Sequence, residues 1–143
     1  MLSFDTNLAV YAANSSVSQH DAARDFITTL AVRTDVVICE LMLVELYLKL
    51  RNSAIFPSPM SAAAAVAWCG NLRNNRNWQL VESAPVMEKV WGLAAVENFA
   101  FRRVIDLRLA LTLRHFGVTD FATTNKKGFE KAGFHRVWNP LVT

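Results

Sequence analysis

Short apolar runs recur along the chain and are separated by stretches whose apolar residues have helical spacing. These runs are four to six residues long and rich in Val, Ile, Leu and Phe, a pattern typical of buried strands. The predicted strands are residues 2–5, 36–39, 78–81, 118–123 and 134–138. Because their apolar residues are nearly continuous rather than alternating, they favour a parallel sheet covered by helices.

The segments between these strands carry apolar residues three and four positions apart, as amphipathic helices do. Ser18 is a candidate N-cap for the first long helix, and Gly117 is a candidate stop for the last one. The other predicted helices are residues 40–51, 61–71 and 103–116, and one that opens at Ser83 and Pro85 and carries its apolar face to Phe101. Strand and helix alternate throughout, so the predicted class is α/β with a mainly parallel sheet of four to five short strands.

The composition fits an ordered protein, with 52% apolar and 19% charged residues in 143 positions. We therefore expect a single domain over residues 1–143, with apolar surface left for a partner or a second copy. Cys39 and Cys69 form no CxxC motif, which excludes a disulfide framework or a zinc knuckle. No stretch reads as a signal peptide or a membrane span, so we expect no membrane association and a cytoplasmic location.

Charge is distributed unevenly along the chain, although the net charge is only +3. Residues 1–50 hold six acidic against three basic residues, whereas residues 101–143 hold eight basic against three acidic ones. This asymmetry is compatible with a metal site combined with a track for a polyanion, and equally with ordinary surface charge.

Two aspartates are placed where a functional site of such a sheet would lie, beyond the carboxyl ends of the strands. Asp5 ends the first predicted strand, where it could either face the site or cap the helix that starts near Asn7. Asp106 shares the apolar face of its helix with Leu109 and Leu113, so its carboxylate points toward the core and needs a cation, donors or a proton. Because that helix must run antiparallel to the strand that follows, its first turn lies at the same edge as Asp5.

Glu45 and Asn125 are further candidates, each with a simple structural alternative. Glu45 lies in the helix after the second strand, but Lys49 at i+4 could pair with it at the surface. Asn125 follows the fourth strand, where Thr123 and Asn125 could contact a water or a phosphate oxygen or only build a turn. Carboxylates without paired His or Cys suit Mg²⁺ or Mn²⁺ rather than zinc, and no phosphate-binding glycine loop or Ser–His–Asp set is present.

In these motifs the sequence resembles the PIN-domain ribonucleases, specifically the VapC-type toxins of bacterial toxin–antitoxin pairs. The resemblance covers nearly the whole chain and rests on four segments in order. They are LSFDTN with Asp5, ICEL through VEL with Glu45, VIDLRLA with Asp106, and ATTNKKGF with Asn125, followed by GF and WNP near the end. It implies a three-layer α/β/α PIN fold over residues 1–143.

The resemblance also implies a function and a set of site residues. Asp5, Asp106 and Glu45 would hold Mg²⁺, with Mn²⁺ as a substitute, and Asn125 would contact the water or the metal shell. The activity implied is an endoribonuclease in which metal-activated water cleaves RNA and leaves a 5′-phosphate. The candidates for binding the RNA backbone are Arg102, Arg103, Lys126 and Lys127. The partners implied are an RNA substrate, a cognate antitoxin protein and a second copy of the chain in a homodimer.

Some positions depart from the family pattern and keep two alternatives open. Asn125 and Gly128 stand where the family often has Asp, which leaves open whether one or two metal ions bind, and Cys39 replaces a common Ser or Thr. One alternative is a non-catalytic PIN domain that binds RNA or a partner. The other is a metal-dependent phosphatase with Asp5 as nucleophile, which usually needs an acid two residues on, where this chain has Asn7.

Overall fold

All strand pairs in the computed structural model, which describes residues 1–142, run parallel. The strands are β1 (Leu2–Phe4), β2 (Val37–Cys39), β3 (Gln79–Val81), β4 (Asp120–Ala122) and β5 (Arg136–Trp138). They pair in the orders β1-β4-β5 and β2-β3, and a parallel bridge between Leu2 and Val36 joins the two groups. The resulting order is β3-β2-β1-β4-β5. It places the carboxyl ends of β1 and β4 side by side, at the position in the sheet where the strand order reverses.

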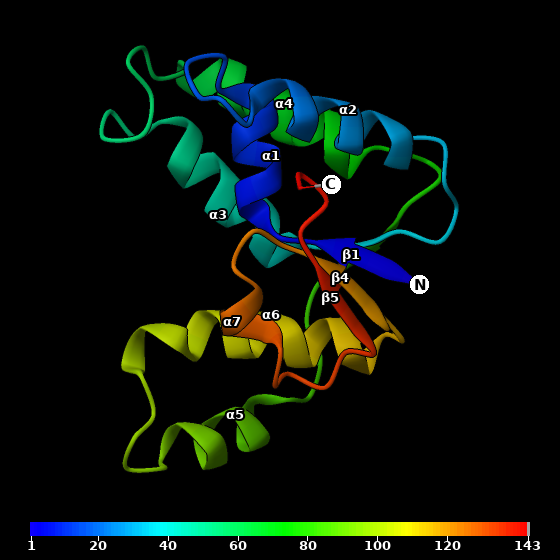
Figure 1. The fold of residues 1–143 in the computed structure, drawn as a ribbon, viewed down its shortest axis with the longest axis vertical. Helices are drawn as coiled ribbons and strands as arrows, with labels where there is room; N and C mark the ends of the chain where they lie inside the picture. The colour runs from blue at the N-terminus through cyan, green and yellow to red at the C-terminus, as the bar shows by residue number, and fades with distance from the viewer. Residues whose placement is uncertain (143) are drawn as a thin grey trace.

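Helices cover both faces of this sheet, which confirms the α/β class and the three layers (Figure 1). The helices are α1 (Thr6–Ala13), α2 (His20–Leu30), α3 (Glu40–Leu50), α4 (Ala62–Arg73), α5 (Met87–Ala94), α6 (Val104–His115) and α7 (Lys126–Phe129), with a 3-10 turn η1 (Phe101–Arg103) before α6. Helices α1 to α4 lie on one side of the sheet and α5 to α7 on the other (Figure 1). No helix within residues 1–142 is long and apolar enough to cross a membrane.

The core between these layers is apolar and closely packed. The three residues of β2 are buried and mostly branched, as strands covered on both faces require. Phe121 of β4 is fully buried, with ring centroids 4.6 Å from Phe129 and 5.1 Å from Phe134. The short helix α7 is therefore held to the sheet by its one buried side chain, Phe129.

Residues that favour the ends of helices predicted some helix boundaries correctly and others wrongly. Gly117 has a φ of 90° and ends α6, as predicted from the freedom of glycine in the left-handed region. The prediction of Ser18 as an N-cap is wrong, because α2 begins at His20 after Gln19, and the Ser18 hydroxyl donates to the Gln19 side chain at 3.2 Å. Phe101 is not on a buried helical face either: α5 ends at Ala94, and 76% of Phe101 is exposed.

Replacing Phe121 by Ala is expected to lower the free energy of unfolding by about 3–5 kcal/mol, because it leaves a cavity between two aromatic neighbours. Phe101→Ala is the matched control, with an expected change within about 0.5 kcal/mol at an exposed position. Urea unfolding followed by circular dichroism measures both values. Equal losses in the two variants would contradict the assignment of the core.

Candidate active site

Asp5 lies at the junction of β1 and α1, and its side chain faces β4 rather than its own helix. Asp5 occupies the N-cap position of α1, yet its carboxylate makes no capping hydrogen bond. Instead its Oδ2 accepts a hydrogen bond of 2.8 Å from the hydroxyl of Thr123, which directly follows β4. The Thr123 oxygen in turn accepts from the backbone N–H of Asn125 at 2.9 Å. Of the two roles considered for Asp5, the side-chain helix cap is therefore absent.

Glu45 lies on α3 with one carboxylate oxygen satisfied and the other without a partner. Thr6 donates its hydroxyl to Oε2 at 3.4 Å, while Oε1 is buried and accepts no hydrogen bond within residues 1–142. The surface ion pair with Lys49 is not formed: the Lys49 ammonium donates to Oδ1 of Asn7 at 2.7 Å. A buried carboxylate oxygen without a donor is costly, so this position calls for a proton or a cation.

Asp106 lies in the first turn of α6 and is half-buried. Leu109, Ala110 and Leu113 on the same face are buried, which confirms that this face packs inward. Arg103, three residues before Asp106, forms no ion pair with it, and its guanidinium donates to the carbonyl of Gly128 at 2.9 Å instead. The Asp106 carboxylate is thus available to a ligand.

The three carboxylates act on one another electrostatically. Burial raises the pKa of Glu45, and the negative charges of Asp106 and Asp5 raise it further, although Lys49 opposes them. Burial also raises the pKa of Asp106, and the charge of Asp5 adds to this shift. Both carboxyl groups are therefore harder to ionise in the folded chain, chiefly because they are buried and secondly because neighbouring carboxylates repel their charge.

This arrangement fits a hard divalent cation in its chemistry. The donors are carboxylate oxygens, and the buried Oε1 of Glu45 has no hydrogen-bond partner in the described part of the chain. Beside them lies a hollow of about 470 Å³ lined by Leu41, Val44, Glu45, Leu48, Lys49, Ile105 and Asp106. Among the described residues, however, no group of three His, Cys, Asp or Glu side chains is arranged to hold a metal ion. A cation at this position would therefore have to draw the carboxylates together.

Asn125 and Gly128, the two departures from the family pattern, contact each other. Asn125 precedes α7, and its Oδ1 accepts from the backbone N–H of Gly128 at 3.3 Å. A Cβ added to Gly128 would lie only 2.6 Å from Nδ2 of Asn125. The Asn125 side chain thus serves as the turn element that sequence reasoning allowed. Its role toward water or metal stays a prediction.

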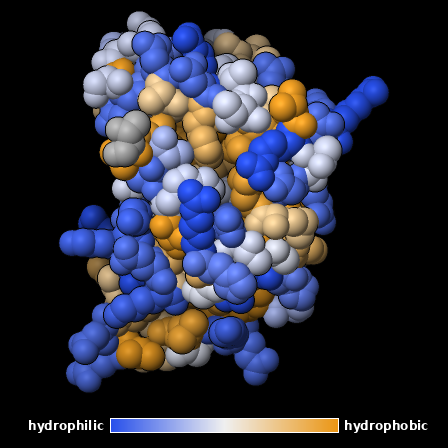
Figure 2. All heavy atoms as spheres, turned by 45° about the vertical axis from the view of Figure 1, so that its right-hand side comes forward, coloured by the Kyte–Doolittle hydropathy of each residue, from blue (hydrophilic) through white to orange (hydrophobic). Residues whose placement is uncertain are grey.

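The four basic candidates lie on η1 and α7, and all are exposed. The hydrogen bond from Arg103 to Gly128 joins these two segments, so Arg102, Arg103, Lys126 and Lys127 belong to one edge of the molecule. In the space-filling view, hydrophilic side chains cover most of the visible face, and apolar ones appear in patches between them, both in its upper half and at its lower end (Figure 2).

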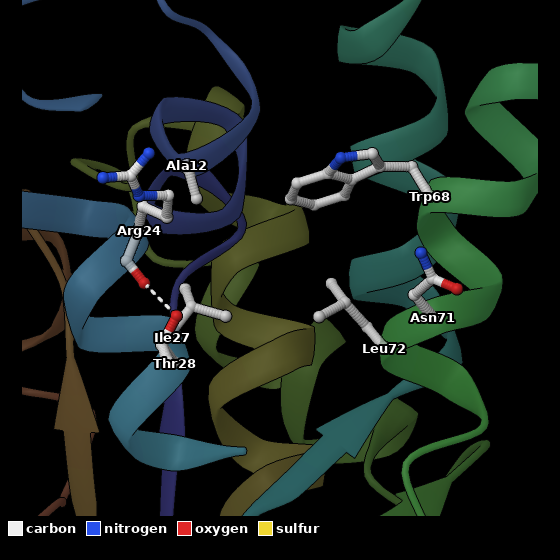
Figure 3. Close-up of a pocket in the computed structure, with 7 residues that line it drawn as sticks. All are labelled: Ala12, Arg24, Ile27, Thr28, Trp68, Asn71 and Leu72. Carbon is white, nitrogen blue, oxygen red and sulfur yellow. Dashed lines mark hydrogen bonds between the residues drawn. The ribbon is translucent and has the colours of Figure 1, made fainter. Parts of the chain in front are cut away.

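A second hollow, of about 250 Å³, lies between α1, α2 and α4 and contains none of the predicted site residues (Figure 3). Its lining residues are Ala12, Arg24, Ile27, Thr28, Trp68, Asn71 and Leu72. Thr28 turns its hydroxyl away from the hollow and donates to the Arg24 carbonyl at 2.8 Å.

Sequence reasoning missed two side chains at the acidic site. Thr6 donates to Glu45, and Lys49 lines the same hollow as Glu45 and Asp106. The signal for Lys49 was its position one helical turn after Glu45, which indicates a shared face, but that spacing alone predicted a surface pair. The placement of Asn7 opposite Lys49 is a tertiary contact between α1 and α3.

Comparison with known proteins gives one strong match in sequence. No family model matches the chain. Ribonuclease VapC24 of Mycobacterium tuberculosis, in the strains CDC 1551 / Oshkosh and ATCC 25618 / H37Rv, is 50% identical over 143 residues, which cover 100% of this chain and 99% of the relative.

Solved structures with the same fold are distant in sequence. Mycobacterium tuberculosis VapC20, described as a toxin that cleaves the sarcin–ricin loop, has a TM-score of 0.66 and 16% identity, covering 94% of this chain and 96% of its own. FitAcB from Neisseria gonorrhoeae has a TM-score of 0.67 and 17% identity over 100% of both chains. FitAB bound to the IR36 DNA fragment has a TM-score of 0.65 and 14% identity, over 100% of this chain and 97% of its own.

Replacing Asp106 by Asn is expected to stabilise the metal-free protein at neutral pH. The pKa of Asp106 is raised on folding. Between the unfolded and the folded pKa the native chain therefore binds more protons than the unfolded chain, and its free energy of unfolding falls as pH rises. The loss of stability that Asp106 causes is absent at pH values well below the ordinary aspartate pKa. It is complete at pH values above the raised pKa of Asp106 in the folded chain.

Thermal unfolding in EDTA, across pH, measures this effect. Asp106→Asn should have a higher Tm than the wild type at neutral pH, and the difference should vanish in acid. Asp120→Asn, at the opposite end of β4, is the control. A lower Tm for Asp106→Asn at neutral pH would contradict the raised pKa.

Proposed function

The chain belongs to the VapC family of PIN-domain ribonucleases, and on that premise we propose that it is a divalent-metal-dependent endoribonuclease. The observation that carries the metal dependence is the buried Oε1 of Glu45, which accepts no hydrogen bond from any described residue. Asp5 and Asp106 lie near enough for their charges to act on the same carboxyl group. Carboxylate oxygens are the ligands that Mg²⁺ and Mn²⁺ prefer.

Each side chain has a proposed task in this reaction. Asp5 and Asp106 would hold the metal most directly, and Glu45 would either bind it or orient the attacking water. Thr123 fixes the Asp5 carboxylate through its hydroxyl, and Asn125 would contact the water or the metal shell. When bound, the metal lowers the pKa of water and stabilises charge on the scissile phosphate. Attack in line on the phosphorus would leave a 5′-phosphate.

The basic edge formed by η1 and α7 supports an RNA substrate. Exposed basic side chains lie there, namely Arg102, Arg103, Lys126 and Lys127. Burial raises the pKa of Asp106, and Arg103 lies close enough for its charge to oppose that rise. This edge would bind backbone phosphates and direct the strand toward the carboxylates, since phosphate contacts position a nucleic acid without reading its sequence.

We also propose that the protein acts as a toxin with a cognate antitoxin and forms a homodimer. Val44, Leu48 and Ile105 are 54%, 62% and 44% exposed, and they line the hollow beside the acids. Such apolar exposure beside an active site supports a partner segment that covers the groove.

A non-catalytic PIN domain that binds RNA or a partner is the second candidate. It is favoured by the absence of a closed ligand set among the described residues and by the neutral Asn125 and Gly128. Metal binding and cleavage distinguish the two candidates.

We predict metal-dependent RNA cleavage that Asp106→Asn lowers by about a hundredfold or more, the scale of losing one preorganised electrostatic group. A panel of single-stranded and structured RNAs is incubated with antitoxin-free protein in Mg²⁺, Mn²⁺ or EDTA, with Asp5→Asn alongside. Asp120→Asn carries the same change at the opposite end of β4 and should retain activity.

Cleavage that persists in EDTA and in the Asp106→Asn variant would contradict the proposed site. Binding of RNA without cleavage in either metal, by folded protein, would establish the non-catalytic candidate. Detection of a covalent phosphoenzyme on Asp5 would instead support a phosphatase.

Lys127→Gln is predicted to weaken RNA binding about equally for all sequences and to reduce the salt dependence of log K by about one unit, because it removes one phosphate contact. Fluorescence anisotropy at several salt concentrations measures the slope. Arg76→Gln is the control, an exposed cation in the turn between α4 and β3. An unchanged slope for Lys127→Gln would exclude this edge as the RNA track.

A further inference from the structure

Lys49 places a positive charge inside the acidic hollow. It lies on α3 one turn after Glu45, and both side chains line the hollow of about 470 Å³ that Asp106 closes from α6. Burial raises the pKa of both carboxyl groups, and the charge of Lys49 opposes this rise at each of them. The described part of the chain nevertheless contains no ion pair between Lys49 and an acid.

The Lys49 ammonium is held by a neutral group instead. Oδ1 of Asn7, in the first turn of α1, accepts its hydrogen bond at 2.7 Å. Asn7 lies two residues after Asp5, so the contact ties the lysine to the same β1–α1 junction that positions the first carboxylate. An ammonium has three donor hydrogens, and this contact uses one of them. The remaining donors are available to a ligand in the hollow.

We propose that Lys49 binds a backbone phosphate oxygen of the RNA at the carboxylate site, an inference that rests on the proposed ribonuclease function. A lysine that served only to neutralise the acids would pair with Glu45, four residues before it. The hydrogen bond to Asn7 keeps the ammonium out of that pair, and it can then donate to an anion that enters the hollow. Small free anions would meet repulsion from the carboxylates, whereas an RNA strand is held by the basic edge as well.

If Lys49 has this role, removing its charge should change the affinities for RNA and for the metal ion in different directions. Lys49→Gln should weaken RNA binding by about ten- to a hundredfold, the scale of a hydrogen bond to a charged group. The same variant should bind Mn²⁺ no more weakly than the wild type, and up to about fivefold more tightly, because a repelling cation has gone. A lysine with a merely structural role would lower both affinities together.

Fluorescence anisotropy with labelled RNA in EDTA, and calorimetric titration with Mn²⁺, measure these affinities on the full chain. Lys49→Arg keeps the charge and should recover most of the RNA affinity. Asn7→Ala retains the lysine but removes its acceptor, so it should weaken RNA binding by a smaller factor, and it tests the inference even if Lys49→Gln does not fold. Lys89→Gln, an exposed site on α5, is the matched control and should behave as the wild type.

The outcomes separate this inference from the proposed function. RNA binding that depends on Lys49 in a wild type that never cleaves would support the phosphate contact and reject the ribonuclease. Cleavage by the wild type with RNA affinity unchanged in Lys49→Gln and Asn7→Ala would overturn the phosphate contact alone. Loss of Mn²⁺ affinity in folded Lys49→Gln would also overturn it.

Discussion

The burial of carboxylates near one another is the constraint on which the site depends. Burial raises the pKa of Glu45 and of Asp106, and the charge of Asp5 adds to both shifts. Folding brings these groups together at a cost, which the apolar core around β2 and β4 offsets by burying branched and aromatic side chains. Buried carboxyl groups with shifted pKa values, held close together at a cost in stability, are typical of functional sites.

The parallel sheet determines which side chains meet at this site. Because β1 and β4 are parallel neighbours, their carboxyl ends coincide, and Thr123 can donate to Asp5 across a separation of 118 residues. The helices that leave this edge then bring Glu45 and Asp106 toward the same place. Lys49 and the basic edge of η1 and α7 add positive charge around the acids, and the proposed metal and RNA backbone would both bind there.

The sequence was enough to predict the strands, the parallel sheet and the positions of the acidic residues on their elements. These features depend on local periodicity and on the order of strands and helices. Val37 to Cys39 reads as a buried strand, and Asp106 shares a face with buried leucines, without any knowledge of the neighbours. The partners of Glu45 and Lys49 depend on how α1 packs against α3, which spacing along one helix does not reveal. For the same reason the short helix α7, whose contacts with the sheet run through Phe129, was not foreseen.

Binding of Mn²⁺ to the wild-type chain tests the central claim most directly, because it needs neither the right RNA nor a partner. Calorimetric titration of the folded, antitoxin-free protein should give saturable binding, since carboxylate oxygens are the hard ligands that such a cation prefers. The binding should disappear when both Asp5 and Asp106 are replaced by Asn. Absence of binding to the wild type, or binding that survives the double replacement, would contradict a metal site built from these carboxylates.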